Sequence, residues 1–555
     1  MTSLMEIAKK VHSGLLTDQN KWLSSWKDIR DYFAPMRGMF KGEQPNDGKM
    51  FNQKKLLNGT PARAARDMAA GLTSGMTSPS HPWFELSLEN KKLKKTKKVK
   101  LWLHTTQELL YSIFRKSNTY SVLNWLYLEF GTFGTGAVMV LSDDDKTIRY
   151  RTFTIGEYSL GVNERGEVDK FSRTFKMTIG QVVGLFGIDN VSDQVKQKYT
   201  KHEYEHYFDI NYLIIPNTNI EIDKARSNRN MPFVSLYWEA KDNNGKFLSI
   251  SGYEEFPILT PRWEVKNSTV SYGVGPGWVA LGDAKMLQKL ERDKLLGIGK
   301  IIDPPVMLDS SVEGVFNRTP GGVTIFDSTN GPNGGAKPAY QIDIRIGELE
   351  NAIYNSERKI QKEFYTDLFL LLSQIQRGQK TATEVEGLED EKRILGPVLD
   401  RMDHEILTPL ITRTLNIMAR QGILPEPPEE IQDEEMTYEY VSVLAKAQKA
   451  VRVGTINGIM NFVAGSAEMF PDIIDNIDID KTIESLSEMT GTPPEIFRDK
   501  TEINRIRNVR NQAAQQQQQA EQVSGAIQGA KALSETQIGD KNAIEKISES
   551  TGTSL

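Results

Sequence analysis

Residues 374–428 read QIQRGQKTATEVEGLEDEKRILGPVLDRMDHEILTPLITRTLNIMARQGILPEPP, and this stretch decides how the chain is organised. Thr381 followed by Glu384 matches a capping box, which satisfies two otherwise unpaired N–H groups and so predicts a helix start. The apolar residues that follow recur mostly three and four positions apart: Leu395, Val398, Leu399, Met402, Ile406, Leu410 and Leu415. This spacing is one face of a helix, so we expect a long helix over 381–425.

The sequence also indicates where this helix ends and where it is interrupted. Gly422 marks the end, and the chain leaves through Pro425, Pro427 and Pro428. Gly396, Pro397 and Pro409 lie inside the helix, where each proline removes a backbone hydrogen bond and clashes with the preceding turn. The helix is therefore predicted to be kinked at these positions.

Composition narrows the class of protein. The chain has 555 residues, of which 39% are hydrophobic and 25% charged, the profile of a soluble protein with several domains. The absence of cysteine excludes disulfides, thiol nucleophiles and Cys-ligated zinc. A net charge of −5 argues against a protein that coats DNA, but not against one past which DNA slides. The opening MTSLMEIAKK lacks an apolar core and no run approaches ~18–20 apolar residues, so secretion and membrane insertion are not expected.

The first half of the chain is predicted to be helical and then β-rich. Helices are expected over 1–35, from Thr60-Pro61 onward and over 101–130, and strands with period two over 137–260. The lysine-rich run KKLKKTKKVK at 91–100 has two readings. It is either a contact for DNA or a scaffold, or a solvated loop and helix start.

His202-Glu203-Tyr204-Glu205-His206 matches the HExxH motif of zinc proteases. That motif needs a helix, which brings both histidines within reach of one metal ion. The flanking residues alternate apolar and polar instead, so we expect a strand, in which residues four apart are roughly 13 Å apart. The sequence therefore argues against zinc chemistry here, and no metal or cofactor is expected.

Two helices are predicted around a compact insert. Pro261-Arg262-Trp263-Glu264 and Tyr272-Gly273-Val274-Gly275-Pro276-Gly277 come first, with glycines at the wrong spacing for a nucleotide loop and a proline suited to a first helical turn. Apolar periodicity then predicts helices over 278–298 and 346–372. Between them, 299–345 is rich in glycine and proline with short β-like runs. An ordinary helical hairpin with an elaborated loop would give the same pattern.

Several of these motifs together resemble a known family. The motifs are TATEV (381–385), LGPVLDRM (395–402), HEILTPLITR (404–413), the RW and YGVGPG pair, and the Ala/Gly-rich helix before Trp83-Phe84. They resemble the head-to-tail connector (portal) proteins of short-tailed tailed phages over roughly residues 20–500. The family often has Met before TATEV and Arg after it, where this chain has Lys380 and, two residues after Val385, Gly387.

The resemblance implies a fold and a division into parts. The fold class is α+β, mainly α, with each subunit part of a ring. The parts are a wing (1–275), a first stem helix (276–298), a β-rich clip (299–345), a second stem helix (346–372), a tunnel loop (373–380), a long kinked wing helix (381–425), a crown (426–500) and a Gln-rich tail (501–555) that is either a barrel-like helix or disordered.

The resemblance also implies site residues. The tunnel loop reaches into the channel, and its contact residues are Gln374, Gln376, Arg377, Gln379 and Lys380. Glutamine offers hydrogen bonds without fixed charge, and Arg377 and Lys380 can touch phosphates without sequence preference. Two cations for each subunit keep such binding weak and salt-sensitive. The alternative for this segment is a plain surface linker.

A portal would be a ring, implied to have twelve subunits, that forms the channel for DNA entry and exit at one capsid vertex. Its implied partners are double-stranded DNA, the terminase large subunit, tail adaptor and tail proteins, and the major capsid and scaffold proteins. It would be part of the virion at the head–tail junction, assembled in the host cytoplasm, and would do no covalent chemistry. The alternatives are an enzyme (a zinc protease or a packaging ATPase-nuclease) and a capsid-associated or scaffold protein without a channel.

Overall fold

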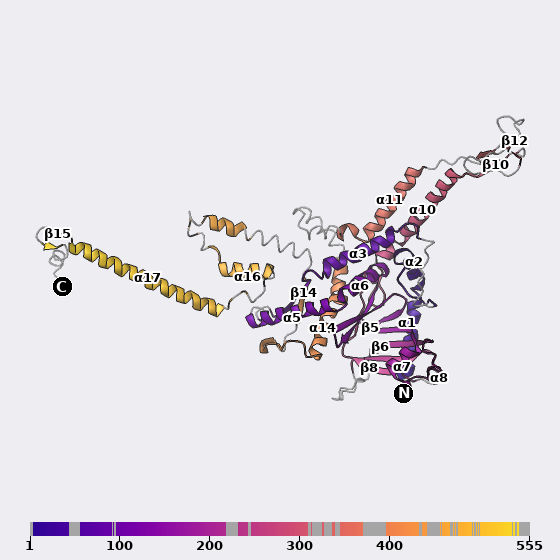
Figure 1. Ribbon diagram of the computed structural model, residues 1–555, viewed down its shortest axis with the longest axis horizontal. Coiled ribbons are helices and arrows are strands. Elements are labelled where there is room, and N and C mark those ends of the chain that lie inside the picture. Colours follow the sequence, from indigo (N-terminus) through magenta and orange to yellow (C-terminus); the bar gives the residue numbers. More distant parts are fainter. Residues whose placement is uncertain are drawn as a thin grey trace. The chain divides into compact units, whose positions relative to one another are not determined.

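The computed structural model describes residues 4–40, 42–43, 56–90, 93, 96–217, 231–241, 246–308, 312–313, 325–326, 336–338, 345–369, 396–431, 436–440, 456, 458–466, 470, 472, 476–490, 492, 496, 498, 500–535, 537–538 and 541–542. The chain divides into two compact units (Figure 1). The larger comprises Met1–Ser87, Thr106–Glu426 and Met436–Arg452, and the smaller Leu88–Thr105, Pro427–Glu435 and Val453–Leu555. The mixture of helices and small sheets confirms the α+β class.

Helices open the larger unit. They are α1 (Leu4–Asn20), α2 (Leu23–Phe33) and α3 (Thr60–Met76), which begins with a proline in its first turn as expected. Trp26 of α2 is fully buried and packs edge-on against Tyr272, with ring centroids 4.9 Å apart. This contact joins the N-terminal helices to the glycine-rich motif nearly 250 residues later in the chain.

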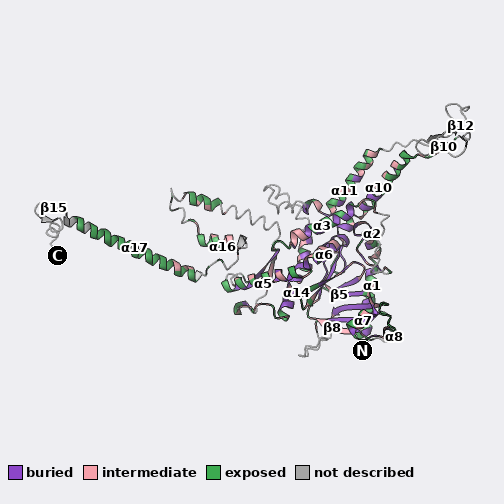
Figure 2. Ribbon diagram, viewed as in Figure 1, coloured by how far each residue is buried: buried purple, intermediate pink, exposed green. Residues whose placement is uncertain are grey.

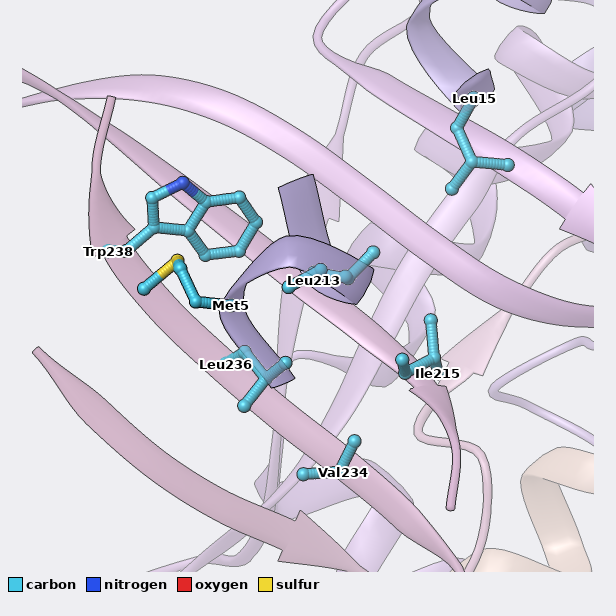
Figure 3. Close-up of a cluster of buried hydrophobic side chains, with 8 residues drawn as sticks. Met5, Leu15, Leu213, Ile215, Val234, Leu236 and Trp238 are labelled. Atoms are coloured by element: carbon cyan, nitrogen blue, oxygen red, sulfur yellow. The ribbon is translucent and has the colours of Figure 1, made fainter. Parts of the chain in front are cut away.

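A five-stranded antiparallel meander forms the main sheet of the larger unit. Its order is β4 (Tyr158–Val162), β5 (Val168–Thr178), β6 (Tyr207–Pro216), β7 (Phe233–Glu239) and β8 (Ser249–Tyr253). Alternate residues of β6 and β7 face α1 and form a buried apolar cluster with it (Figure 3). The cluster is Met5, Ala8 and Leu15 from α1, Leu213 and Ile215 from β6, and Val234, Leu236 and Trp238 from β7.

The strands predicted over 137–260 are confirmed, but two helices interrupt them. α7 (Ile179–Phe186) and α8 (Asp193–Thr200) contribute to a second apolar cluster that includes Ile210, and the exposed 3-10 helix η2 (Ile188–Asn190) lies between them in the chain. Thr178 and Gln181 form a complete capping box at the start of α7. This capping pattern is present in the sequence, but the helix α7 was not predicted from it.

A smaller sheet and two long helices complete the body of the larger unit. The sheet order is β3 (Thr147–Phe153), β2 (Ala137–Asp143) and β9 (Ile258–Leu259). The helix predicted over 101–130 is in fact two, α5 (Lys97–Lys116) and α6 (Thr119–Phe133), separated at Ser117 and Asn118. β1 (Phe84–Leu88) pairs with β14 (Met436–Tyr440), a strand that helical periodicity did not predict.

The predicted helical hairpin is present and projects from this body (Figure 1). α9 (Pro276–Val279) leads into α10 (Leu281–Ile302), and α11 (Ile346–Glu363) returns beside it. Short strands lie between them: β10 (Val306–Leu308) pairs with β13 (Ala336–Pro338), and β11 (Val312–Glu313) with β12 (Ile325–Phe326).

After residue 395 the chain is helical again. Residues 396–402 are helical, the π-helical segment η4 (Asp403–Leu407) follows, and α14 (Thr408–Arg420) completes the helix. Gly422 has a φ of 68°, the amide of Ile423 donates to the carbonyl of Met418, and the amide of Gly422 donates to that of Ala419. These two bonds form a Schellman motif, which confirms Gly422 as the end of the helix.

The smaller unit contains a few short elements and one long helix. They are η5 (Glu429–Ile431), α16 (Ile479–Thr490), α17 (Lys500–Glu535), and the strand pair β15 (Gln537–Ile538) and β16 (Lys541–Asn542). α17 carries the five-glutamine run, and nearly all of its described side chains are exposed (Figure 2). Arg507 of α17 holds both carboxylate oxygens of Asp480 on α16, at 2.6 and 2.7 Å.

Candidate functional site

The base of the helical hairpin is held by polar contacts from both of its helices. Gln288 of α10 is buried; its Oε1 accepts from the amides of Leu57 (2.6 Å) and Asn58 (2.8 Å), and its Nε2 donates to the Asn58 carbonyl at 2.8 Å. The side-chain amide of Asn58 donates to Glu291 of α10 at 2.9 Å and to Glu357 of α11 at 2.8 Å. One asparagine therefore bridges the two helices at the point where they leave the body.

The glycine motif at 273–277 packs directly against the end of α6. A Cβ atom on Gly277 would lie 2.1 Å from the carbonyl oxygen of Thr132, and one on Gly275 would lie 2.8 Å from that of Gly131. Glycine is required because any side chain would collide with backbone. Pro276 occupies the first turn of α9, as the sequence predicted, and Trp278 Nε1 donates to the carbonyl of Phe133 at 2.8 Å. The motif thus lets the start of the hairpin pack closely against the end of α6.

The buried side chain of Arg262 joins three segments of the body. Its amide donates to Glu405 Oε2 at 2.7 Å, and its Nε and Nη2 donate to Glu405 Oε1 at 3.0 and 2.5 Å. The remaining guanidinium N–H groups donate to the carbonyls of Gly166 (2.8 Å) and Val270 (3.3 Å). Because both charges are largely removed from water and are hydrogen-bonded to each other, loss of either partner would leave the other uncompensated.

Trp263, the next residue, lies against the end of the second helix of the hairpin. Its ring is stacked on Tyr365, with centroids 6.1 Å apart and an interplanar angle of 25°. Tyr365 directly follows Phe364, the C-cap residue of α11, and has a φ of 53°, in the left-handed region. A non-glycine residue in this region costs about 1–2 kcal/mol, so the surrounding contacts must hold it there.

The π-helical segment η4 has a local cause. Pro409 has no N–H group, and its ring would collide with the carbonyl of residue 405 in a regular α-helix. The wider turn of η4 ends with the amide of Thr408 donating to the carbonyl of Asp403, five residues back. This widened turn presents Glu405 to Arg262. Farther along, Arg413 Nε donates to the Val140 carbonyl at 3.0 Å; burial lowers the pKa of Arg413, while Glu255 opposes this shift.

The far half of α10 is exposed, although much of it is apolar (Figure 2). Leu295 is 58% exposed, Leu296 57% and Ile302 78%. Met307 and Leu308 on β10 are exposed as well. Contiguous exposed apolar side chains of this kind mark interaction surfaces. We call Leu295, Leu296, Ile301 and Ile302 the hairpin apolar surface.

The expected channel and capping residues lie mostly outside the described residues. These are Gln374, Gln376, Arg377, Gln379, Lys380, Thr381 and Glu384. Gly396 and Pro397 are at the beginning of the described helix, and Pro409 is in the first turn of α14. Gln288, which holds the hairpin, and Arg262, which holds the long helix, were not singled out as contacts from the sequence, because their partners are over 140 residues away.

The strand expected at His202–His206 is wrong. β6 begins only at Tyr207, and the HEYEH residues form a turn after α8. His202 has a φ of 59°, and its Nδ1 lies 2.6 Å from the hydroxyl of Tyr204. α8 ends at Thr200 and the alternating residues of β6 begin at Tyr207, so the chain changes direction within these residues. Among the described residues, no group of three or more His, Asp or Glu side chains is arranged to hold a metal ion.

Comparisons with known proteins agree with the motifs. The family model for "Bacteriophage head to tail connecting protein" matches residues 6–497. The portal protein of Salmonella phage epsilon15 is 36% identical over 540 residues, which cover 97% of both chains. The probable portal protein of Bordetella phage BPP-1 is 36% identical over 518 residues, covering 93% of this chain and 92% of that protein.

A solved chain from the virion of a native gene transfer agent particle covers 80% of this chain at 10% identity, with a TM-score of 0.32, which is too low to bear on the fold. Within the described residues, no helix has the length and apolar character needed to cross a membrane. The family match and the two phage relatives span nearly the whole sequence, and they include the hairpin and the long helix described above. This chain belongs to the family of bacteriophage head-to-tail connecting proteins, the portal proteins.

Proposed function

We propose that this chain is the subunit of a portal ring at one capsid vertex, with a central channel through which the phage DNA enters and leaves. The observation that carries the proposal is the hairpin apolar surface, which lies on a helix projecting from the body. Burying a half-exposed leucine or isoleucine contributes about 1 kcal/mol, so four of them supply a meaningful part of one subunit contact. Leu295 and Ile302 are seven residues apart and so share one face of α10. In the proposed ring this face meets a different surface of the next subunit, and such head-to-tail contacts close into a ring when the rotation permits.

The parts of the subunit suit different partners of that ring. The insert between α10 and α11 is rich in glycine and proline and contains two short strand pairs at the far end of the hairpin, where a docking surface for the terminase large subunit would be accessible (Figure 1). Residues 373–380 follow the second hairpin helix and carry Arg377 and Lys380, which we assign to weak phosphate contacts in the channel. The capsid, scaffold and tail proteins would contact the remaining outer surfaces, in a virion assembled in the host cytoplasm.

Electron microscopy of the purified protein tests this proposal directly. We expect discrete rings with a central hole, and the resemblance implies twelve subunits in each. Leu295→Glu combined with Leu296→Glu should convert rings to monomers, because charges would be placed in the contact. Leu185→Glu, a matched change at an exposed leucine on α7, should leave rings intact. Soluble monomers, shells or rods from the unmodified protein would instead favour a capsid-associated protein without a channel.

A further inference from the structure

Arg262 and Trp263 are neighbours whose side chains reach two different helices. Arg262 forms an isolated β-bridge with Thr135, and the amide of Trp263 donates to the carbonyl of Gly134 at 2.9 Å. Glu264 forms a second isolated bridge, with Val274, and the backbone bends at Trp263 between the two bridges. This short stretch of backbone is thus anchored to the body at both ends and carries one side chain for each of two helices.

Arg262 contacts the long helix. Three of the hydrogen bonds of Arg262 go to the carboxylate of Glu405, and Glu405 stands within the widened turn η4. π-Helical turns of this kind are deformable points in a helix and often mark functional positions. The guanidinium group holds Oε1 and the backbone amide of Arg262 holds Oε2, so the carboxylate is fixed in both position and orientation.

Trp263 contacts the end of α11. Trp263 is stacked on Tyr365 and also contacts Phe130 of α6, with ring centroids 4.9 Å apart. The position after a helix C-cap is usually glycine when φ is positive, yet here it is tyrosine. The left-handed backbone conformation disfavours tyrosine at this position. We attribute the presence of Tyr365 to the contact that its ring makes with Trp263.

We propose that Arg262 and Trp263 are positioning residues that couple the end of the hairpin helix α11 to the π-helical segment η4, so that a displacement of the hairpin is passed to the long helix. Both contacts are made through one stretch of backbone, and neither requires a second subunit. The coupling is therefore a property of the single subunit, and it stands or falls independently of the ring and of DNA.

Hydrogen exchange followed by mass spectrometry on the full-length protein tests this coupling. In Trp263→Leu we expect the amides of η4 to exchange about tenfold faster, equivalent to about 1.4 kcal/mol. This would occur although the ring contacts of Trp263 lie on α6 and at the end of α11. Arg262→Gln should have the reciprocal effect, faster exchange at residues 364–369. Trp263→Phe retains an aromatic ring and should recover most of the protection at η4.

The controls separate coupling from general loosening. Tyr354→Ala removes an exposed ring from α11, and Arg420→Gln removes an exposed cation from α14. Both should leave exchange at the distant helix unchanged. The strands of the five-stranded sheet should exchange at the parental rate in every variant. If Trp263→Leu loosens the whole unit, Tyr365→Leu, which removes the stacked partner of Trp263, provides the measurement instead. If each substitution changed amide exchange only in the helix that the substituted side chain contacts, the proposal would be wrong.

Discussion

The hydroxyl of Thr154 donates a 2.8 Å hydrogen bond to Oε1 of Glu129, and Glu129 is completely buried. The amide of Ile155 donates to Oε2 at 3.1 Å, and the same threonine hydroxyl accepts from the amide of Gly38 at 2.7 Å. Burial raises the pKa of Glu129 to about 7, while Arg37 and these hydrogen bonds oppose the shift. The carboxyl group therefore ties helix α6 to two loops in a protonation-dependent way.

A pH dependence of stability follows from Glu129. Between pH 4.5, the ordinary value for the unfolded chain, and about 7, the folded protein keeps a proton that the unfolded chain has released. Stability should therefore fall as pH rises through this window, by at most roughly 3 kcal/mol. Denaturant titrations at several pH values should show this slope in the difference between the stabilities of the parent and of Glu129→Gln.

His12 provides the internal comparison. Burial lowers its pKa from 6.5 to about 4, so its contribution has the opposite sign and is lost as pH falls from 6.5 to 4. The parental profile contains both contributions, and the difference between the parent and Glu129→Gln isolates the carboxyl. A difference that does not vary with pH would contradict the assigned protonation state of Glu129.

Glycine at 277 is required by sterics, whereas glycine at 282 is not. Gly277→Ala should destabilise the protein by about 1–3 kcal/mol or displace α9, because the new methyl would overlap the Thr132 carbonyl. Gly282, in α10, has open space around its Cβ position. Gly282→Ala should stabilise the helix by about 1 kcal/mol. Thermal unfolding of the two variants should move in opposite directions; equal shifts would contradict the packing described here.

The buried hydrogen bonds of Gln288 at the base of the hairpin should contribute more to stability than the exposed charges beside it. Gln288→Ala removes the hydrogen bonds to Leu57 and Asn58 and should cost about 1–3 kcal/mol. Limited proteolysis should then cut more rapidly near residues 56–60. Lys289→Ala, at the exposed neighbouring position, is the control and should change neither stability nor cleavage.

Deleting residues 312–336 from the insert should leave rings intact and abolish binding of the packaging motor. The deletion removes turn-rich sequence from the far end of the hairpin, while α10 and α11 retain their mutual contacts. Ring formation is measured by electron microscopy and motor binding by co-sedimentation with the terminase large subunit. Loss of the rings themselves would place the insert in the subunit contact.

Replacing Arg377 and Lys380 with Glu tests the proposed channel contact. Assembly should be unchanged, but DNA retention in filled heads or its ejection should change, because new carboxylates repel phosphates. Replacing both residues with Gln is the matched control and should have a weaker effect. Normal packaging, retention and ejection in the Glu variant would show that these residues do not contact DNA.

The elements with strong local signals were predicted correctly from the sequence. The proline at the start of α3, the glycine that ends α14, the hairpin with its β-containing insert and the strands after residue 137 are examples. Each depends on backbone conformations or periodicities that neighbouring residues specify themselves. The missed α7 also had such a signal in Thr178 and Gln181, whereas the break between α5 and α6 carried neither glycine nor proline.

What the sequence determined by itself is therefore the local structure and, through its motifs, the portal family. Only the tertiary structure decided which distant residues meet. Arg262 reaches Glu405 across 143 residues, and β1 pairs with β14 across more than 340. The left-handed Tyr365 likewise has no local cause. A periodic pattern shows that a face will be buried but not against what, because burial is non-directional and the partner is chosen by the packing of the whole chain.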